Sequence, residues 1–257
     1  MVDGSSGSAL VNYSGNTYAA WNWKAGGTAV SNTDGSITSQ VSANTDAGFS
    51  IVSWVGSGAN ATVGHGLAAK PQLIIAKNRN GTPDAWPVYS ETIGAANRLY
   101  LNLTNSSSAA STIWNNTEPT NQVFSVGTAA LINQSTKDII AYCFHSVDGY
   151  SKVGSYVGNA STDGAFVYTG FRPAFLLLKK EAAGDWGIYD NKRDGFNESN
   201  AVLYPAESIV EENQASRRID ILSNGFKLRT SNVTFNNTST TIFLAFAENP
   251  FKYANAR

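Results

Sequence analysis

The sequence predicts an all-β fold made of two tandem antiparallel β-sandwich repeats, and three observations support this. The first is an internal duplication, because Pro71–Asn78 and Asp84–Tyr89 reappear about one hundred residues later as Pro173–Lys180 and Asp185–Asn191. The second is a series of short apolar runs separated by turn residues, a pattern typical of β-sandwiches. The third is composition: only 14% of the residues are charged, and the many Ser, Thr and Asn residues disfavour helix interiors.

Residues 1–47 are interpreted as a linker and the last strand of a preceding repeat. The first sixteen residues are rich in Gly, Ser and Asn, and we expect partial disorder there. Thr17–Lys24 has the pattern of two later segments, Asp138–His145 and Thr241–Glu248, in which an alanine precedes an aromatic residue within an apolar run. Thr17–Lys24 therefore reads as a remnant strand whose repeat body is missing.

Alternation along these three segments assigns their two faces, because successive side chains of a strand point to opposite sides. One face carries the bulky side chains, namely Trp21, Trp23, Tyr142, Phe144, Leu244 and Phe246. The other face carries the small ones, namely Ala20, Ala141, Cys143, Ala245 and Ala247. A strand that is apolar on both faces is covered on both, so each segment is predicted to be a central strand.

The first repeat is predicted to span residues 48–151. The turn residues Thr33–Ser36 predict a hairpin in the linker before it. Strand-like runs then follow at 49–56, 73–75, 84–89, 98–103, 123–126 and 138–145, with a polar loop at 104–112.

The second repeat is predicted to span residues 152–257. Its Ser155–Gly158 corresponds to Ser53–Gly56 of the first repeat, and Asn224-Gly225 predicts a hairpin turn. Residues 206–217 are the stretch predicted to form a helical turn. A single larger sandwich built from both halves is the alternative to two tandem sandwiches.

Two pairs of aromatic residues stand at equivalent positions of the two repeats. Trp86 and Trp186 alternate with Val88 and Ile188, so we predict that both tryptophans face inward as core residues and not outward as sugar-stacking platforms. Tyr89 and its counterpart Tyr189 then fall on the opposite face of the same strands.

A candidate ligand-binding cluster follows the second of these strands. It consists of Tyr189, Asp190, Asn191, Lys192, Arg193 and Asp194. Carboxylate, amide and guanidinium groups on one loop match the vicinal hydroxyls of a sugar or an anionic sugar. The competing interpretation is a solvated turn whose charges pair locally.

Carboxylates offer weaker candidates for catalysis. Asp84 with Glu91, or Asp185 with Asp190, could supply the two carboxyl groups, about 5 to 10 Å apart, that glycoside hydrolysis requires. Carboxylates near strand ends more often accept hydrogen bonds within turns. We therefore predict no catalytic residue.

Composition excludes several classes of function. A net charge of −1 gives no field to attract nucleic acid. Cys143 has no partner for an intrachain disulfide, and His65 and His145 lie in different strands without metal-ligand spacing, so neither a metal site nor a cofactor is predicted. No apolar run is long enough to insert into a membrane, and residues 1–8 do not have the pattern of a signal peptide.

Six segments that span most of residues 17–253 carry a family resemblance: Thr17–Gly27, Lys152–Tyr156, Tyr168–Phe175, Tyr189–Arg193, Leu222–Lys227 and Ala245–Pro250. They resemble the tandem repeat found near the ends of large tail-fibre-like structural proteins of marine tailed bacteriophages. The resemblance implies jelly-roll or lectin-like sandwiches, a location in the virion, contacts with other virion subunits, and a capacity to form homotrimers. In the first repeat Ser90–Ile93 replaces the Asp-Asn-Lys-Arg run, so any polar site there should differ or be absent.

The predicted function is a virion structural module of a tail fibre or similar appendage, which displays a face to host-surface polysaccharide or another receptor. Two alternatives stay open. One is a fibre-borne enzyme that degrades polysaccharide, and the other is a purely architectural spacer. Release of reducing ends from host polysaccharide, lost on mutating Asp185 or Asp190, would favour the enzyme. An exposed and concave 189–194 loop, and not one packed against a neighbour, would argue against the spacer.

Overall fold

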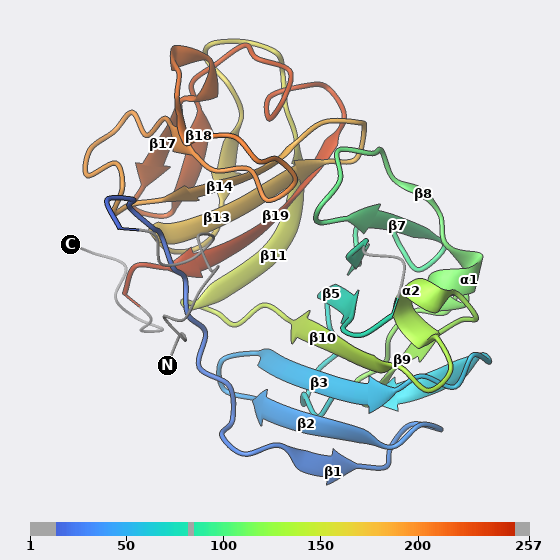
Figure 1. Cartoon of the computed structure of the whole chain (residues 1–257). Helices are drawn as coiled ribbons and strands as arrows, with labels where there is room; N and C mark the ends of the chain where they lie inside the picture. Colours follow the sequence, from blue (N-terminus) through green and yellow to red (C-terminus); the bar gives the residue numbers. More distant parts are fainter. Residues whose placement is uncertain (1–13, 82–84, 250–257) are drawn as a thin grey trace.

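The computed structural model describes residues 14–81 and 85–249, and these form a mostly β structure with several antiparallel sheets (Figure 1). In Figure 1 the first half of the chain, from blue to green, lies below and to the right of the second half, from yellow to red. The predicted all-β class is therefore confirmed. No helix in the described ranges has the length and apolar character needed to cross a membrane.

The first half contains one eight-stranded sheet and one two-stranded sheet. The order in the large sheet is β1 (Val30–Asn32), β2 (Ser39–Asn44), β3 (Phe49–Val55), β10 (Asp138–Phe144), β5 (Leu73–Asn78), β6 (Pro87–Ser90), β7 (Asn97–Tyr100) and β8 (Ser108–Ala109). The small sheet pairs β4 (Ala61–Gly64) with β9 (Val123–Val126). Two short helices, α1 (Ser111–Trp114) and α2 (Ala130–Asn133), lie beside them.

The second half contains three smaller sheets. The four-stranded sheet has the order β11 (Ser151–Val157), β19 (Thr240–Ala247), β13 (Pro173–Lys180) and β14 (Trp186–Asp190). The three-stranded sheet has the order β12 (Phe166–Tyr168), β18 (Gly225–Leu228) and β17 (Ile219–Leu222). The last sheet pairs β15 (Ala201–Val202) with β16 (Glu212–Asn213).

The two halves repeat one strand order. The sequence β3-β10-β5-β6 in the first half matches β11-β19-β13-β14 in the second, and the pair β4-β9 matches β12-β18. The registers match as well: Phe144 of β10 pairs with Leu73 of β5, and Phe246 of β19 pairs with Phe175 of β13. The repeated segments of the sequence therefore occupy equivalent places in the two sheets.

The predicted faces of β10 and β19 are confirmed. Each strand lies between two neighbours, and the small side chains of Ala141, Cys143 and Ala245 point into the core of their own half. The bulky side chains of both strands point into a third apolar cluster, which we call the shared core because both halves contribute to it. Its buried members are Phe49, Leu73, Ile75, Val88, Ile93, Leu99, Phe144, Val153, Phe175, Leu177, Trp186, Ile242, Leu244 and Phe246. Phe144 and Phe246 meet there with ring centroids 6.2 Å apart.

Residues 17–24 do not form the predicted last strand. They pair with no strand in the described part of the chain. The side chains still alternate, since Trp21 and Trp23 are half-buried against the shared core while Asn22 is exposed. The pattern correctly predicted which face is apolar, but strand pairing needs partners that the pattern cannot supply. Disorder is expected for residues 1–16, and most of these residues lie outside the described ranges.

The predicted helical turn at 206–217 is also wrong. That stretch contains β16 and a single 3-10 turn, Ala215–Arg217. Helices appear instead at α1, at the end of the predicted polar loop, and at α2. Both hairpins are confirmed, because β1 pairs with β2 and β17 pairs with β18. The turn of the second hairpin is Ser223-Asn224, one residue earlier than the predicted Asn224-Gly225, since Gly225 already pairs with Leu222.

The outer edges of two strands in the second half are covered by side chains. At β11, the backbone N–H of Val153 donates to Ser146 Oγ at 3.0 Å. At β12, the carbonyl of Tyr168 accepts a hydrogen bond from Lys152 Nζ at 3.2 Å. In the first half the edge of β4 is covered by backbone, because Ile37 N–H donates to the Thr62 carbonyl at 3.0 Å.

Candidate functional site

Tyr189, the first residue of the predicted cluster, is fully buried in the core of the second half. Its hydroxyl donates to the Arg217 carbonyl at 2.9 Å, and its ring meets Phe235 edge to face. Burial raises the pKa of its hydroxyl well above the ordinary value. Tyr89 is equally buried in the first half, so both tyrosines do lie on the face opposite the tryptophans. Tyr189 thus contributes packing and offers no surface to a ligand.

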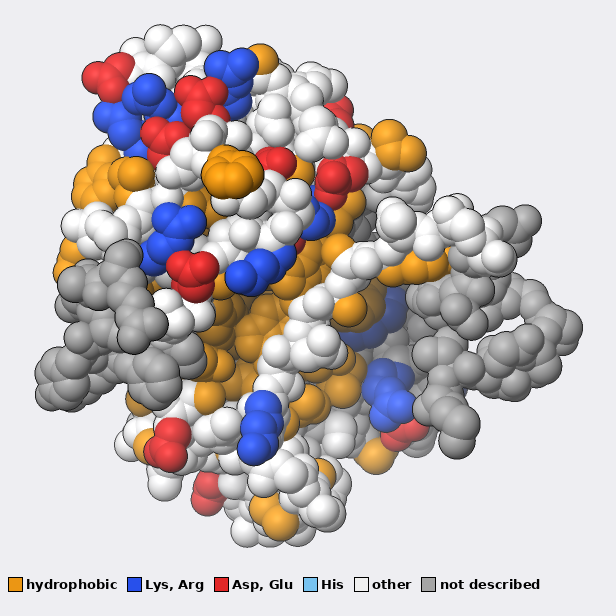
Figure 2. Space-filling view, turned by 90° about the vertical axis from the view of Figure 1, so that its left-hand side faces the viewer, with side chains coloured by type: hydrophobic (Ala, Val, Ile, Leu, Met, Phe, Trp, Pro, Cys, Tyr) orange, Lys and Arg blue, Asp and Glu red, His pale blue; other side chains and the backbone are white. Residues whose placement is uncertain are grey.

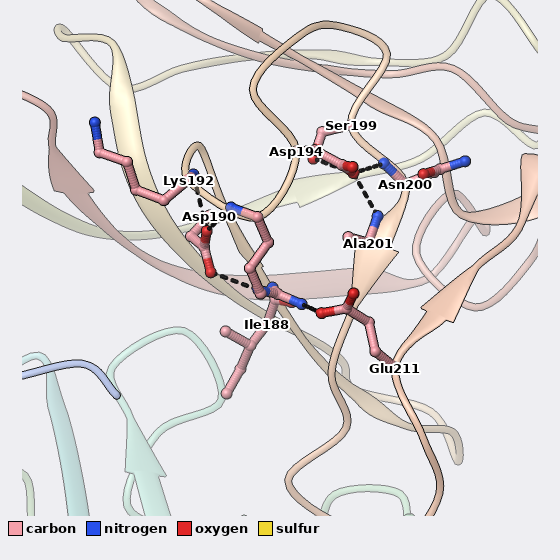
Figure 3. Close-up of polar contacts among 9 residues, drawn as sticks. Ile188, Asp190, Lys192, Asp194, Ser199, Asn200, Ala201 and Glu211 are labelled. Atoms are coloured by element: carbon pink, nitrogen blue, oxygen red, sulfur yellow. Dashed lines mark hydrogen bonds and ion pairs between the residues drawn. The ribbon is translucent and has the colours of Figure 1, made fainter. Parts of the chain in front are cut away.

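The buried Asp190 forms an ion pair with the half-buried Arg193 (Figure 3). Arg193 Nε lies 2.7 Å from Asp190 Oδ2, while Asp190 Oδ1 accepts the backbone N–H groups of Lys192 and Arg193, each at 2.9 Å. Burial opposes ionisation of Asp190, but these hydrogen bonds outweigh it and lower the pKa of the carboxyl. The Asp190 carboxylate therefore stabilises the turn that follows it.

The remaining nitrogens of Arg193 are also used within the chain. Its Nη1 lies 2.5 Å from Glu211 Oε2, and its Nη2 donates to the Ile188 carbonyl at 3.0 Å (Figure 3). The guanidinium group also lies over the ring of Trp21, 5.7 Å from its centroid. Arg193 thus connects the 190–194 turn to two segments that are distant in the sequence.

Asn191, Lys192 and Asp194 complete the cluster. Asn191 Nδ2 donates to Glu248 Oε1 at 2.8 Å. Asp194 Oδ2 accepts the backbone N–H groups of Asn200 and Ala201, each at 2.6 Å (Figure 3). Lys192 is the exposed member of the six, and the others are buried or half-buried. These contacts favour the interpretation of a locally paired turn, and a ligand-binding role for the cluster stays a prediction.

Of the four candidate carboxylates, Glu91 and Asp190 are paired with other groups of the chain, and Asp185 is half-buried directly before β14. Glu91 lies 3.0 Å from Lys70 Nζ and accepts a hydrogen bond from Gln72 Nε2 at 3.0 Å. Asp190 is held by Arg193, as described above. Asp84 lies outside the described residues. The contacts on Glu91 and Asp190 are those of structural carboxylates.

His65 and Cys143 are buried in the first half. The His65 ring accepts the Leu67 N–H at Nδ1, 3.1 Å away, and its Nε2 lies 3.2 Å from the Thr120 carbonyl. Burial lowers the pKa of His65 from 6.5 to about 4 and raises the pKa of the Cys143 thiol to about 12. In the described residues no group of three or more His, Cys, Asp or Glu side chains could hold a metal ion.

A cleft of about 430 Å³ lies where the bulky faces of the two halves meet, and sequence reasoning did not find it. Figure 2 shows hydrophobic side chains gathered in a hollow at the middle of one face of the molecule. Tyr142 and Phe144 of the first half line the cleft opposite Phe175 and Leu244 of the second half. The alternating bulky residues are the only sequence feature that points to the cleft. They predict an apolar face, but they do not show what that face packs against.

The equivalent tryptophans differ in burial. Trp186 is fully buried in the shared core, as predicted, and its Nε1 donates to the Tyr100 carbonyl at 2.6 Å. Trp86 is only half-buried, since one side of its ring lines the cleft and Lys77 Nζ lies 5.6 Å from the ring centroid. Trp86 therefore meets the prediction of a core residue only in part.

Comparisons with known proteins place the chain in a family. A search of curated proteins and a search of solved structures each found no match. The family model described as a domain of unknown function (DUF7483) matches residues 1–250, a range that includes both halves of the structure and the segment that carries Trp21 and Trp23. The chain therefore belongs to the DUF7483 family.

Proposed function

We propose that this chain is a structural and display module of a virion appendage such as a tail fibre. Its two halves, 48–151 and 152–257, would be tandem β-sandwich repeats of the jelly-roll or lectin-like kind. The observation that carries the proposal is the repeated strand order of the two halves, whose bulky faces pack into one shared core. Such a body gives a fibre a stiff unit that can be repeated, and it leaves the outer surfaces for recognition.

The second half carries aromatic side chains suited to recognition. Phe166 and Tyr168 point outward from β12, and Tyr168 is 58% exposed with Lys152 Nζ 5.3 Å from its ring centroid. Register places Thr62 and Gly64 at the equivalent positions of β4. Aromatic rings that are half in water and next to polar groups are common at recognition surfaces. We assign polysaccharide binding to this face, in addition to any contact through Lys192.

A binding experiment tests the display role. The chain and its Tyr168→Ala variant are applied to a glycan array and to intact bacterial cells, with Val30→Ala as the control because Val30 is 65% exposed and lies on β1 of the first half. We expect binding that Tyr168→Ala weakens about tenfold, equivalent to about 1.4 kcal/mol. If the unaltered chain binds neither glycans nor cells, the architectural spacer role remains. Homotrimer formation belongs to the same proposal and is measured by sedimentation equilibrium.

A further inference from the structure

The cleft between the two sheets is chemically uniform. Among the residues that the structure describes, every side chain that lines it is apolar or aromatic, including three of the six tryptophans, Trp21, Trp23 and Trp86. A volume of about 430 Å³ falls within the range of small-molecule sites. The cleft opens onto one face of the molecule (Figure 2), and exposed apolar surfaces rimmed by polar residues commonly mark ligand or interaction sites.

One side of the cleft is held by hydrogen bonds between the two halves. The turn 181–186 and the loop 100–107 form what we call the latch. Gly184 N–H donates to the Thr104 carbonyl at 2.7 Å, and Ser107 N–H donates to the Glu181 carbonyl at 2.7 Å. Inside the turn, the buried Lys179 Nζ donates to the Gly184 carbonyl at 2.8 Å and fixes its shape.

The short connection between β10 and β11 is also tied to both halves. Gln72 Oε1 accepts the backbone N–H of Ser146 at 2.7 Å, which ties the connection to the first half. Ala247 N–H donates to the Tyr150 carbonyl at 2.8 Å, and the Tyr150 ring packs edge-on against Phe246, which tie it to the second half. The latch and this connection therefore fix the two halves, and with them the walls of the cleft, relative to each other at two separate places.

The segment carrying Trp21 and Trp23 is fixed along the cleft. Trp23 contacts Phe144 of the first half and Phe175 of the second, with ring centroids 6.4 and 5.3 Å apart. Further along, the Ser42 hydroxyl donates to the Gly27 carbonyl at 2.6 Å. The two indoles therefore form a third wall that is in place before any ligand arrives.

We propose that this cleft is a preformed binding site for an uncharged hydrocarbon group, either an acyl chain or an aromatic ring. Ordered water needs two to four polar partners, and this lining offers almost none. A charged or highly hydroxylated ligand would lose its hydration without replacement. An apolar group removes the aromatic walls from water at no such cost. The site is separate from the polysaccharide face and does not depend on it.

Substitutions on one strand test the proposal. Ile51 of β3 lines the cleft, whereas Val55 stands on the same face of β3 but is 56% exposed and outside the lining. Ile51→Trp fills the cleft, and Val55→Trp adds the same side chain elsewhere. The probe is N-phenyl-1-naphthylamine, an uncharged dye that fluoresces in apolar sites, and unfolding temperature is recorded for each variant.

We expect one saturable dye site, about tenfold weaker in Ile51→Trp and unchanged in Val55→Trp, with both variants folded. Ile51→Ala, which enlarges the cleft, should retain binding and shows that the loss follows volume and not damage to the strand. Displacement by decanol or by naphthalene distinguishes a chain from a ring. Absence of saturable binding, or equal binding by the two Trp variants, would overturn the proposal. So would a dimer of the unaltered chain that Ile51→Trp dissociates, because a second copy would then occupy the cleft.

Discussion

A single side chain, that of Trp186, connects the two halves of the molecule. It is 1% exposed, its ring lies in the shared core, and its Nε1 donates to the Tyr100 carbonyl of the other half. Trp186→Ala should lower the free energy of unfolding by about 3 to 5 kcal/mol, measured by urea denaturation. Phe196→Ala, at a position that is 89% exposed, should change it by no more than about 0.5 kcal/mol. Equal free energies of unfolding for the two variants would contradict the assignment of Trp186 to the core.

His65 should make stability depend on pH. Its lowered pKa, from 6.5 to about 4, means that the unfolded chain binds the proton more tightly, so stability is complete above about pH 6.5 and is lost as the pH falls toward 4. Protonation would also place a hydrogen on Nδ1, which accepts the Leu67 N–H.

From about pH 7.5 to about pH 5, the wild type should therefore lose about 2 kcal/mol more than His65→Gln, which does not titrate there. Denaturant titrations of both proteins at the two pH values measure this difference. Parallel losses in the two proteins would show that His65 does not carry the dependence.

The residues of the 189–194 cluster show how far sequence reasoning reaches at this scale. Alternation correctly placed Tyr89 and Tyr189 on the face opposite Trp186. It could not show that Arg193 meets Glu211 and Trp21, because those contacts join segments that lie far apart in the chain. Local composition therefore identified a polar cluster, but whether its groups are free depends on tertiary contacts.

The strand β19 needs small side chains on the face that packs into the core of the second half. Ala245 is fully buried in the core of the second half, while its neighbour Leu244 points into the shared core. Ala245→Leu should lower the free energy of unfolding by about 1 to 3 kcal/mol because the core has no space for the added atoms. Leu244→Met nearly conserves volume and should cost less than about 1.5 kcal/mol. Thermal denaturation measures both, and a tolerated Ala245→Leu would contradict the tight packing of that face.

Elements that carry their own pattern were predictable, and elements that depend on partners were not. The central strands β10 and β19 could be predicted because their sequences are apolar on both faces. Residues 17–24 share that pattern, yet no described strand pairs with them. Residues 206–217 have helical composition, but pairing of β15 with β16 competes successfully for that stretch. Asp84 and the other residues at 82–84 lie outside the described ranges.

The shared core should make the whole molecule unfold in one step. Ile132 lies in the core of the first half and Ile219 in that of the second, and both are fully buried. Ile132→Val and Ile219→Val should each cost about 0.5 to 1.5 kcal/mol and shift the same single calorimetric transition. Equal calorimetric and van't Hoff enthalpies establish the single step. Two transitions that respond separately to the two substitutions would show that the halves are thermodynamically independent.

The arrangement of the halves is the part of the fold that the sequence could not supply. The duplication predicts that β5 and β13 are equivalent, and the matching strand orders agree with this. The sequence pattern predicts two bulky faces, but it does not predict that these two faces pack against each other. Each could equally pack against a separate layer of its own half. The cleft and the latch arise from that meeting, so both were absent from the sequence-based prediction. The family model, which spans residues 1–250, treats the two halves as one unit.

The covered edges of β11 and β12 bear on how copies of this chain behave when crowded. Bare strand edges invite sheets to grow from one molecule into the next, which leads to aggregation. Ser146 occupies a backbone donor of β11, and Lys152 places an ammonium group across the rim of β12. A neighbouring strand would have to displace both and accept a cation at the junction. These two contacts therefore oppose sheet growth through β11 and β12.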